Sequence, residues 1–206
     1  MPKGFSEHEK ELIRKRLLKE GYQQFSTYGL KKTNIEELAE ATGISKGAFY
    51  LFYDSKEALF MDVVELAEKR YRQEILAAIE KWGPSPRARL YAIFKQFFTA
   101  LRSMPILKFI TGSDFELIFR KLPAEKLQEH LASDQAFFID LVEHCRNAGI
   151  PIQMPPAEVG RLLYPLVLAS LHEDDLRIDN FSGSIDTLLE LIAAFCLGEV
   201  RLEGRV

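Results

Sequence analysis

A short run of small and basic residues has the chemistry to bind an anion. Ser45 can cap the start of a helix, and Lys46, Gly47 and Ala48 would then form its first turn. Such a tip is narrow and carries hydrogen-bond donors, so it could enter the major groove of DNA closely. Tyr50 lies further along the same helix, where its hydroxyl could reach a backbone phosphate. These residue types predict a nucleic-acid-binding tip.

Lys56 is predicted to lie in the first turn of the next helix, which starts at a capping box opened by Asp54. Backbone amides at that helix N-terminus and the lysine ammonium could hold one phosphate together. A purely structural alternative stays open for single residues. Ser45 could act only as a cap, and Gly47 could serve only to permit close helix packing.

Helical periodicity runs through nearly the whole chain, and no segment alternates over the length of a strand. Capping boxes at Ser6, Thr33 and Asp54 predict three helix starts, and Gly29 and Gly43 predict the ends of the first two helices. Further helical segments are expected from about 54 to 82, across 90–101, in short elements at 105–112 and 113–122, and over 123–147, 154–171 and 182–200. An all-α fold follows from this pattern.

Gly21 falls on the apolar face of the first predicted helix, together with Ile13, Leu17 and Phe25. Glycine in a helix interior costs about 1 kcal/mol relative to alanine. We therefore expect close packing against a neighbouring helix at this position.

Two short capped helices joined by residues 41–44 form a helix-turn-helix pattern, which alone is a weak signal. The full string from Thr33 to Phe60 is far more specific, and it closely resembles the N-terminal domain of the tetracycline-repressor (TetR) family of regulators. The resemblance covers about residues 8–60, and the rest of the chain is similar only in length and helical layout. It implies a three-helix DNA-binding domain at 1–56 and a helical bundle for ligand binding and dimerisation at 57–206.

The family pattern also implies roles for individual residues. Thr33 resembles a phosphate contact, Tyr50 a contact to the DNA backbone, and Lys56 a phosphate-binding lysine. The tip of the recognition helix corresponds to Lys46, Gly47 and Ala48. The predicted DNA-binding residues are thus Thr33, Ser45, Lys46, Gly47, Ala48, Tyr50 and Lys56.

This chain departs from the family at one position in the string. The family usually has His or Tyr followed by Phe, whereas this chain has Phe52 followed by Tyr53. A polar contact from position 52 is therefore not expected. Tyr53 either belongs to the core or replaces that contact.

The resemblance implies a sequence-specific transcriptional regulator that is not an enzyme. By analogy it would be a ligand-released repressor that binds a pseudo-palindromic duplex operator as a homodimer. The alternative is an all-helical small-molecule-binding protein or enzyme without a DNA function, in which the N-terminal helices are purely structural. The string from Thr33 to Lys56 favours the regulator, because such an enzyme would not need it.

Eight of the 15 phenylalanines lie between positions 94 and 138. Such a concentration could line a pocket between helices for an apolar or aromatic small-molecule effector. A filled aromatic core is the alternative for each residue taken singly. The predicted lining residues are Phe94, Phe97, Phe98, Phe109, Phe115, Phe119 and Phe138.

The last two predicted long helices are apolar around more than half of their circumference. A terminal helix of this kind must be covered, and a second copy could cover it in a two-fold, four-helix contact. The predicted dimer interface consists of Leu163, Leu166, Val167, Ser170, Leu188, Ile192 and Phe195.

Composition and charge narrow the class of protein. The chain of 206 residues is 47% hydrophobic and 28% charged, which is typical of a globular protein. Its net charge is −3, yet residues 1–56 hold ten Lys and Arg against eight Asp and Glu, whereas the remainder holds seventeen against twenty-two. Binding to DNA must therefore depend on local geometry, because the overall field gives it little support.

Several other kinds of protein are not expected. The two cysteines are far apart, which fits unpaired thiols in a reducing compartment, and the start of the chain does not resemble a signal peptide. The longest apolar run is too short for a bilayer, so we expect a cytoplasmic protein with no membrane contact. His130, His144 and the segment 172–175 lack the spacing of metal ligands. No cofactor or catalytic motif is apparent.

Overall fold

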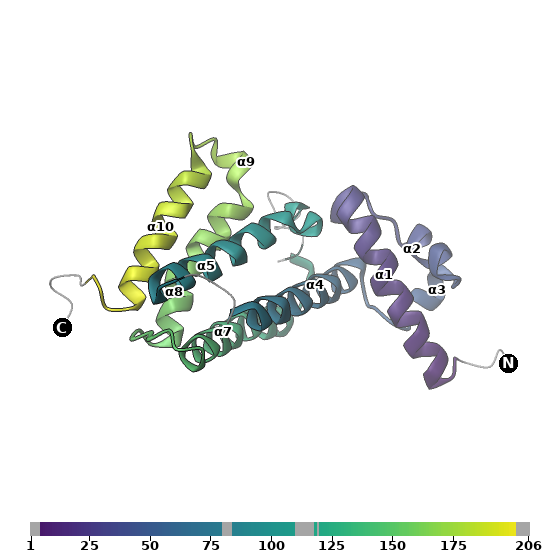
Figure 1. Ribbon diagram of the computed structural model, residues 1–206. Helices are drawn as coiled ribbons and strands as arrows, with labels where there is room; N and C mark the ends of the chain where they lie inside the picture. Colours follow the sequence, from purple (N-terminus) through teal and green to yellow (C-terminus); the bar gives the residue numbers. More distant parts are fainter. Residues whose placement is uncertain (1–4, 80–83, 110–117, 119, 201–206) are drawn as a thin grey trace. The chain divides into compact units, whose positions relative to one another are not determined.

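The computed structural model describes residues 5–79, 84–109, 118 and 120–200. Every regular element in these residues is helical, as the periodicity predicts (Figure 1). None of the described helices combines the length and apolar character that crossing a membrane requires. The chain divides into two compact units, one comprising Met1–Lys69 and Met104–Leu127 and the other Arg70–Ser103 and Gln128–Val206.

The first unit contains three N-terminal helices that pack together (Figure 1). They are α1 (Glu7–Lys32), α2 (Ile35–Thr42) and α3 (Lys46–Phe49). The unit also holds the first part of α4 (Lys56–Ala78), the 3-10 helix η2 (Pro105–Phe109) and the beginning of α7 (Ala124–Asn147). Its core is apolar and fully buried at Leu17, Phe25, Leu38, Phe49 and Phe60.

Local capping chemistry defines the ends of these helices. The Ser6 hydroxyl accepts a hydrogen bond from the Glu9 amide, and Glu9 accepts one from the Ser6 amide, so the first predicted capping box is confirmed. Gly29 has φ +74° and interrupts α1 one turn before its end, and Gly43 has φ +76° at the end of α2. Both predicted glycine stops are confirmed, because these left-handed conformations favour glycine.

Two predicted N-caps are each displaced by one residue. Asn34, not Thr33, caps α2, and its side-chain oxygen accepts a hydrogen bond from the Glu36 amide at 2.9 Å. Thr33 instead closes α1, because its hydroxyl donates to the Gly29 carbonyl at 2.8 Å. At the start of α4, the Ser55 hydroxyl accepts a hydrogen bond from the Ala58 amide at 3.1 Å, so Asp54 is not the cap.

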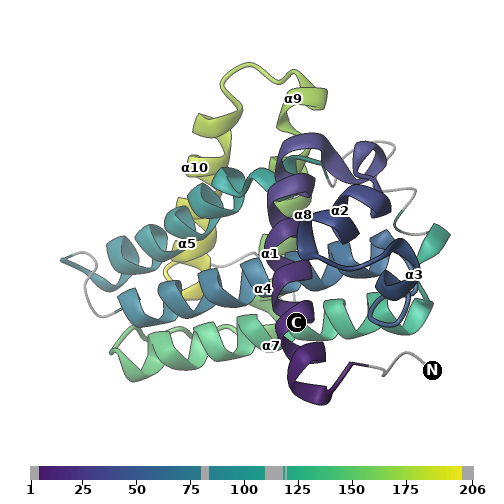
Figure 2. The ribbon, with the colours of Figure 1, turned by 90° about the vertical axis from the view of Figure 1, so that its right-hand side faces the viewer.

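The second unit is built around α5 (Pro86–Ser103), which packs against α8 (Pro156–Leu171) and α10 (Phe181–Cys196) (Figure 2). A four-residue helix, α9 (Glu173–Leu176), follows α8. The helix predicted across 90–101 is confirmed, and the apolar residues that form a stripe along it are all buried. They are Leu90, Ile93, Phe94, Phe97, Phe98 and Leu101.

Gly21 is buried in α1, and the expected close approach is confirmed. A β-carbon at this position would lie 3.1 Å from the Val63 side chain, 3.3 Å from Phe25 and 3.4 Å from Leu59. The first two separations are tighter than ordinary contact, and Val63 and Leu59 lie on α4. Gly21 therefore allows α1 and α4 to pack directly against each other.

We predict that Gly21→Val lowers the free energy of unfolding by about 1–3 kcal/mol, because the added methyl groups overpack the contact between α1 and α4. Urea unfolding followed by circular dichroism at the helix band would measure the change. Gly47→Ala is the matched control, because a β-carbon there meets only the Ser45 hydroxyl, at 3.9 Å. Equal loss of stability in both variants would contradict the packing explanation.

Candidate nucleic-acid interface

The tip of α3 is an exposed, capped helix start. The Ser45 hydroxyl accepts a hydrogen bond from the Ala48 amide at 3.1 Å, while Lys46 and Gly47 are exposed. Because a β-carbon at Gly47 would meet no other helix, this glycine is not required for close helix packing. Its small size leaves the tip narrow, which suits entry into the major groove of DNA.

Tyr50 follows directly as the C-cap of α3, and its side chain is 47% exposed. Its ring stands edge-on against the buried Phe49, with centroids 5.6 Å apart and planes at 88°. This contact anchors one side of the ring in the core. The rest of the side chain faces the groove described next.

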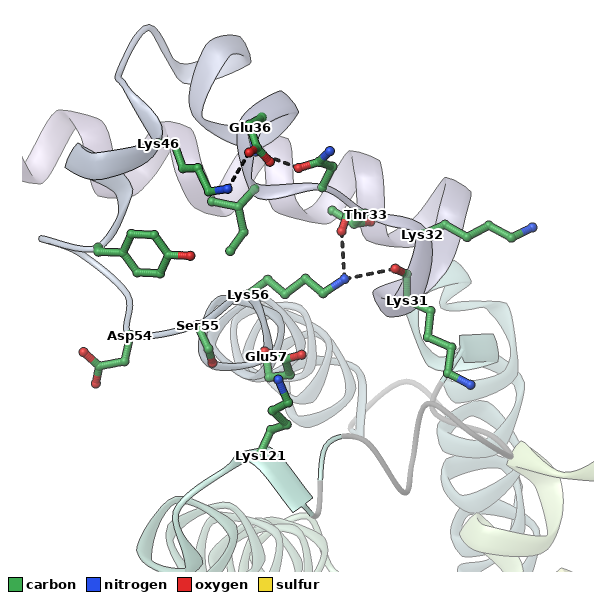
Figure 3. Close-up of a pocket in the computed structure, with 13 residues that line it drawn as sticks. Lys31, Lys32, Thr33, Glu36, Lys46, Asp54, Ser55, Lys56, Glu57 and Lys121 are labelled. Carbon is green, nitrogen blue, oxygen red and sulfur yellow. Dashed lines mark hydrogen bonds and ion pairs between the residues drawn. The ribbon is translucent and has the colours of Figure 1, made fainter.

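A groove of about 540 Å³ lies beside this tip (Figure 3). Residues from the end of α1 and the starts of α2, α3 and α4 line it, together with Lys121, which precedes α7. Five lysines and three acidic residues contribute to the walls: Lys31, Lys32, Lys46, Lys56 and Lys121, and Glu36, Asp54 and Glu57. The groove thus carries an excess of positive charge on a chain whose net charge is negative.

An ion pair joins the first turns of α2 and α3. The Lys46 ammonium donates a hydrogen bond to the Glu36 carboxylate (Figure 3). This bond raises the pKa of Lys46 and lowers the pKa of Glu36, so both groups are charged at neutral pH. Because about half of each side chain is exposed, the pair contributes little to stability. Its main effect is to draw the cation toward α2.

Lys56 closes the end of α1. Its ammonium donates to the Lys31 carbonyl at 3.0 Å and to the Thr33 carbonyl at 2.8 Å (Figure 3). The last carbonyls of a helix lack partners within the helix and carry partial negative charge, so a cation there is stabilising. The sequence predicted the position of Lys56 in the first turn of α4, but it did not reveal this structural role.

Thr33 lines the groove, but its side chain is only 2% exposed and is turned inward to Gly29. The sequence predicted a cap of the second helix here and the resemblance implied a phosphate contact, and the inward hydroxyl differs from the predicted cap. The physical reason is the break at Gly29, which leaves a carbonyl that the threonine hydroxyl satisfies. A phosphate contact from Thr33 stays a prediction.

Phe52 is partly exposed, whereas Tyr53 is buried. Phe52 lies against Phe5 with ring centroids 5.9 Å apart, and Tyr53 is 8% exposed, with its ring 6.1 Å from that of Phe49. Burial, followed by the Asp62 carboxylate, raises the pKa of the Tyr53 hydroxyl. Of the two alternatives for Tyr53, the structure supports the core residue.

Sequence reasoning missed several residues of the groove. Lys31 and Lys32 lie two and three residues after Gly29, so their position just before the predicted second helix was a usable signal. The capping box opened by Thr33 predicts only a capping role for Glu36. Lys121 is brought to the groove by tertiary folding from 65 positions beyond Lys56, and no local pattern marked it.

The predicted effector residues that the structure describes lie mainly in a packed interior. Phe94, Phe97 and Phe98 are between 1% and 7% exposed, and the Phe97 ring contacts those of Phe98, Phe137 and Phe138. A cavity of about 380 Å³ lies in the second unit between α7 and α8, and Phe138 lines it. Phe115 and Phe119, and the side chain of Phe109, lie outside the described residues.

The predicted dimer residues fall into two groups. Leu163 and Ser170 are 0% and 6% exposed within a single chain, because this side of α8 faces the interior of its own unit. Leu188 is 41% exposed, and the partly exposed members are Leu166, Val167, Ile192 and Phe195. Two exposed leucines were missed, namely Leu168 at 38% and Leu191 at 55%. The interface itself stays a prediction.

The described part of the chain is thus helical, with an N-terminal helix-turn-helix and a basic groove beside it. Residues 17–63 match the family described as bacterial regulatory proteins, tetR family. The HTH-type transcriptional regulator AcrR of Shigella flexneri is 32% identical over 158 residues, which cover 75% of this chain and 72% of that protein. The chain therefore belongs to the tetR family of bacterial regulatory proteins.

Other relatives match over shorter regions or in fold alone. The uncharacterized HTH-type transcriptional regulator YerO of Bacillus subtilis is 44% identical over 52 residues, which are 25% of this chain and 18% of YerO. In each of three curated relatives, YerO among them, the matched region covers less than a third of that relative's length. The crystal structure of FadR from Bacillus subtilis in complex with stearoyl-CoA is 15% identical, with a TM-score of 0.59 over 87% of this chain and 97% of that chain.

We predict that Lys56→Met lowers the free energy of unfolding by about 1–3 kcal/mol, because two carbonyl groups lose a charged hydrogen-bond donor. Thermal and urea unfolding of the whole chain would detect the loss. Lys32→Met provides the control, since the exposed Lys32 is a neighbouring lysine of the same groove. If the two variants were equally stable, Lys56 would not hold the end of α1.

Proposed function

We propose that this chain is a sequence-specific DNA-binding transcriptional regulator, a cytoplasmic repressor that acts as a homodimer and is released by a small-molecule effector. One observation carries the proposal. The exposed tip of α3, formed by Ser45, Lys46, Gly47 and Ala48, lies beside a groove that five lysines line. A base-reading element and a phosphate-binding element are thus neighbours.

The groove supplies the part of binding that does not depend on sequence. Lysine ammonium groups and the amides at the starts of α2 and α4 are the donors that DNA phosphates need. Tyr50 adds an exposed hydroxyl on the side of α3 that faces the groove. Sequence would then be read by the tip of α3, because only a narrow helix end reaches the base edges in the major groove.

A second copy of the chain would supply a second tip. Leu168, Leu188 and Leu191 are exposed on α8 and α10, and burying such side chains against a partner is favourable. A two-fold dimer presents two recognition helices to successive major grooves about 34–36 Å apart, which requires a pseudo-palindromic operator. This geometry supports dimeric binding.

Release by an effector is supported by the family and by the cavity between α7 and α8. The FadR protein of similar fold holds stearoyl-CoA, so a helical body of this kind can accommodate an apolar group. To reverse binding, an effector must favour the state that cannot bind the operator. Shifting the ratio of the DNA-binding state to the non-binding state from 99:1 to 1:99 requires the effector to bind the non-binding state about 5.5 kcal/mol more tightly.

Selection of binding sites from a random library of duplex DNA with the purified chain tests the proposed function. We expect an enriched pseudo-palindrome, and we expect its enrichment to be lost in the double variant Lys46→Ala/Tyr50→Phe. Circular dichroism of the variant provides the folding control. No enrichment by the folded protein at low salt would instead favour a helical small-molecule-binding protein or an enzyme.

Removing the ion pair between Glu36 and Lys46 should strengthen DNA binding, whereas the double variant above should weaken it. Glu36→Gln should tighten binding to the selected duplex, because a carboxylate leaves the groove and Lys46 becomes available to a phosphate. The slope of log K against log salt concentration should steepen by about 0.9, the value for one added phosphate contact. Glu37→Gln is the matched control, since Glu37 is exposed and does not line the groove. An equal effect of both substitutions would assign the change to overall charge.

A further inference from the structure

Leu51 is an apolar side chain that lies on the surface directly after α3. Its exposed fraction is 69%, the largest among the bulky hydrophobic residues in the described part of the chain. Single exposed leucines are common on protein surfaces and by themselves indicate nothing. The place of Leu51 is different, because it follows Tyr50 at the end of the helix whose tip is proposed to read DNA.

Helical hydrogen bonding continues from α3 through Leu51. The Leu51 amide donates to the Ala48 carbonyl at 3.1 Å, and the Tyr53 amide donates to the Phe49 carbonyl, also at 3.1 Å. Residues 46–53 therefore form one helical segment, and side chains that are four positions apart in such a segment lie on the same face. The segment can be divided into faces on this basis.

Two faces of this segment already have a role. Phe49 and Tyr53 form the buried face, with exposed fractions of 0% and 8%. Lys46 and Tyr50 form a second face, because both line the basic groove. The Lys46 ammonium is also held toward α2 by the Glu36 carboxylate (Figure 3). The two exposed polar side chains of the segment thus lie on the side of the phosphate-binding groove.

The third face of the segment is apolar. It consists of Gly47, Ala48 and Leu51, and these three residues do not line the groove. Gly47 and Leu51 are exposed, and Ala48 is partly exposed. Their side chains carry neither a hydrogen-bond donor nor an acceptor. This apolar face therefore cannot recognise a base through side-chain hydrogen bonds.

A thymine methyl group is the chemical complement of the apolar face. Among the four standard bases, thymine alone presents an apolar group in the major groove, the methyl on C5. Contact between that methyl and an apolar side chain removes apolar surface from water on both sides, which is favourable. Charge favours DNA over another apolar surface as the occupant, because the lysine-lined groove adjoins this face on the same helical segment.

We propose that Leu51 is a specificity-determining residue that contacts a thymine methyl group in each half-site of the operator. The inference rests on the proposed DNA-binding function and names the base that this face selects. Gly47 and Ala48 are small, so Leu51 is the side chain of the face that projects toward a base edge. A polar base edge at the same place would lose its water without gaining a hydrogen bond, which disfavours the other bases.

Replacing thymine by uracil in the duplex tests the contact, because deoxyuridine still pairs with adenine and lacks only the C5 methyl. The duplex obtained by selection is synthesised with this change at one symmetric pair of thymines at a time. We expect one pair at which the original chain loses about fourfold in affinity per half-site, the ratio that corresponds to burying one methyl-sized group. If uracil were tolerated at every position, the proposal would be overturned.

The variant Leu51→Ala assigns the loss to this side chain. It should bind the thymine and uracil duplexes nearly equally, and selection with it should give the same operator without a base preference at that position. Leu66→Ala is the matched control, since Leu66 is 52% exposed in the same unit but lies on α4 and does not line the groove. The control should keep the full difference between the duplexes, and circular dichroism checks that both variants fold. An undiminished difference in Leu51→Ala would contradict the proposal.

The remaining outcomes separate this inference from the function on which it rests. A lower dimer fraction of Leu51→Ala in light scattering would make the apolar face an interface between copies of the chain, which would overturn the proposal. A selected duplex that binds equally well with thymine or uracil would overturn the inference and leave the DNA-binding function standing. Failure of the folded chain to select any duplex would count against the DNA-binding function, and the inference would fall with it.

Discussion

The hydrogen bonds from the Lys56 ammonium to the last carbonyls of α1 fix the arrangement on which the groove depends. The carbonyls of Lys31 and Thr33, at the end of α1, both accept hydrogen bonds from this ammonium. Asn34, the residue after Thr33, caps α2, so the same interaction lies directly before the start of α2. One side chain on α4 therefore holds the end of α1 directly before the start of α2, and α3 then follows after a turn of three residues.

A local excess of cations allows an acidic chain to bind a polyanion. The chain has a net charge of −3, yet five lysines surround one groove, and they come from the end of α1, the starts of α3 and α4, and the segment before α7. Glu36 reduces this excess by holding Lys46. In the function proposed above, such a balance would keep affinity for arbitrary DNA moderate, so that contacts from the tip of α3 would decide which sequences are bound.

The sequence predicted most of the fold because helix starts and stops are local. The Ser6 capping box, the stops at Gly29 and Gly43 and the buried stripe of α5 all depend on residues within a few positions of one another. The site was only partly predictable, since it depends on tertiary contacts. Lys121 reaches the groove from a distant segment, and Leu163 turns out to face its own unit. Thr33 and Asn34 are both good caps, and only the position of the Gly29 carbonyl decides between them.

The proposed function requires two tips of α3 on one two-fold dimer, and the spacing of the DNA half-sites tests this requirement most directly. The measurement is the affinity of the protein for its selected duplex before and after five base pairs, half a helical turn, are inserted between the half-sites. Two rigidly coupled recognition helices cannot then face the same side of the DNA, so affinity should fall to that of a single half-site. Unchanged affinity for the lengthened duplex would contradict dimeric recognition.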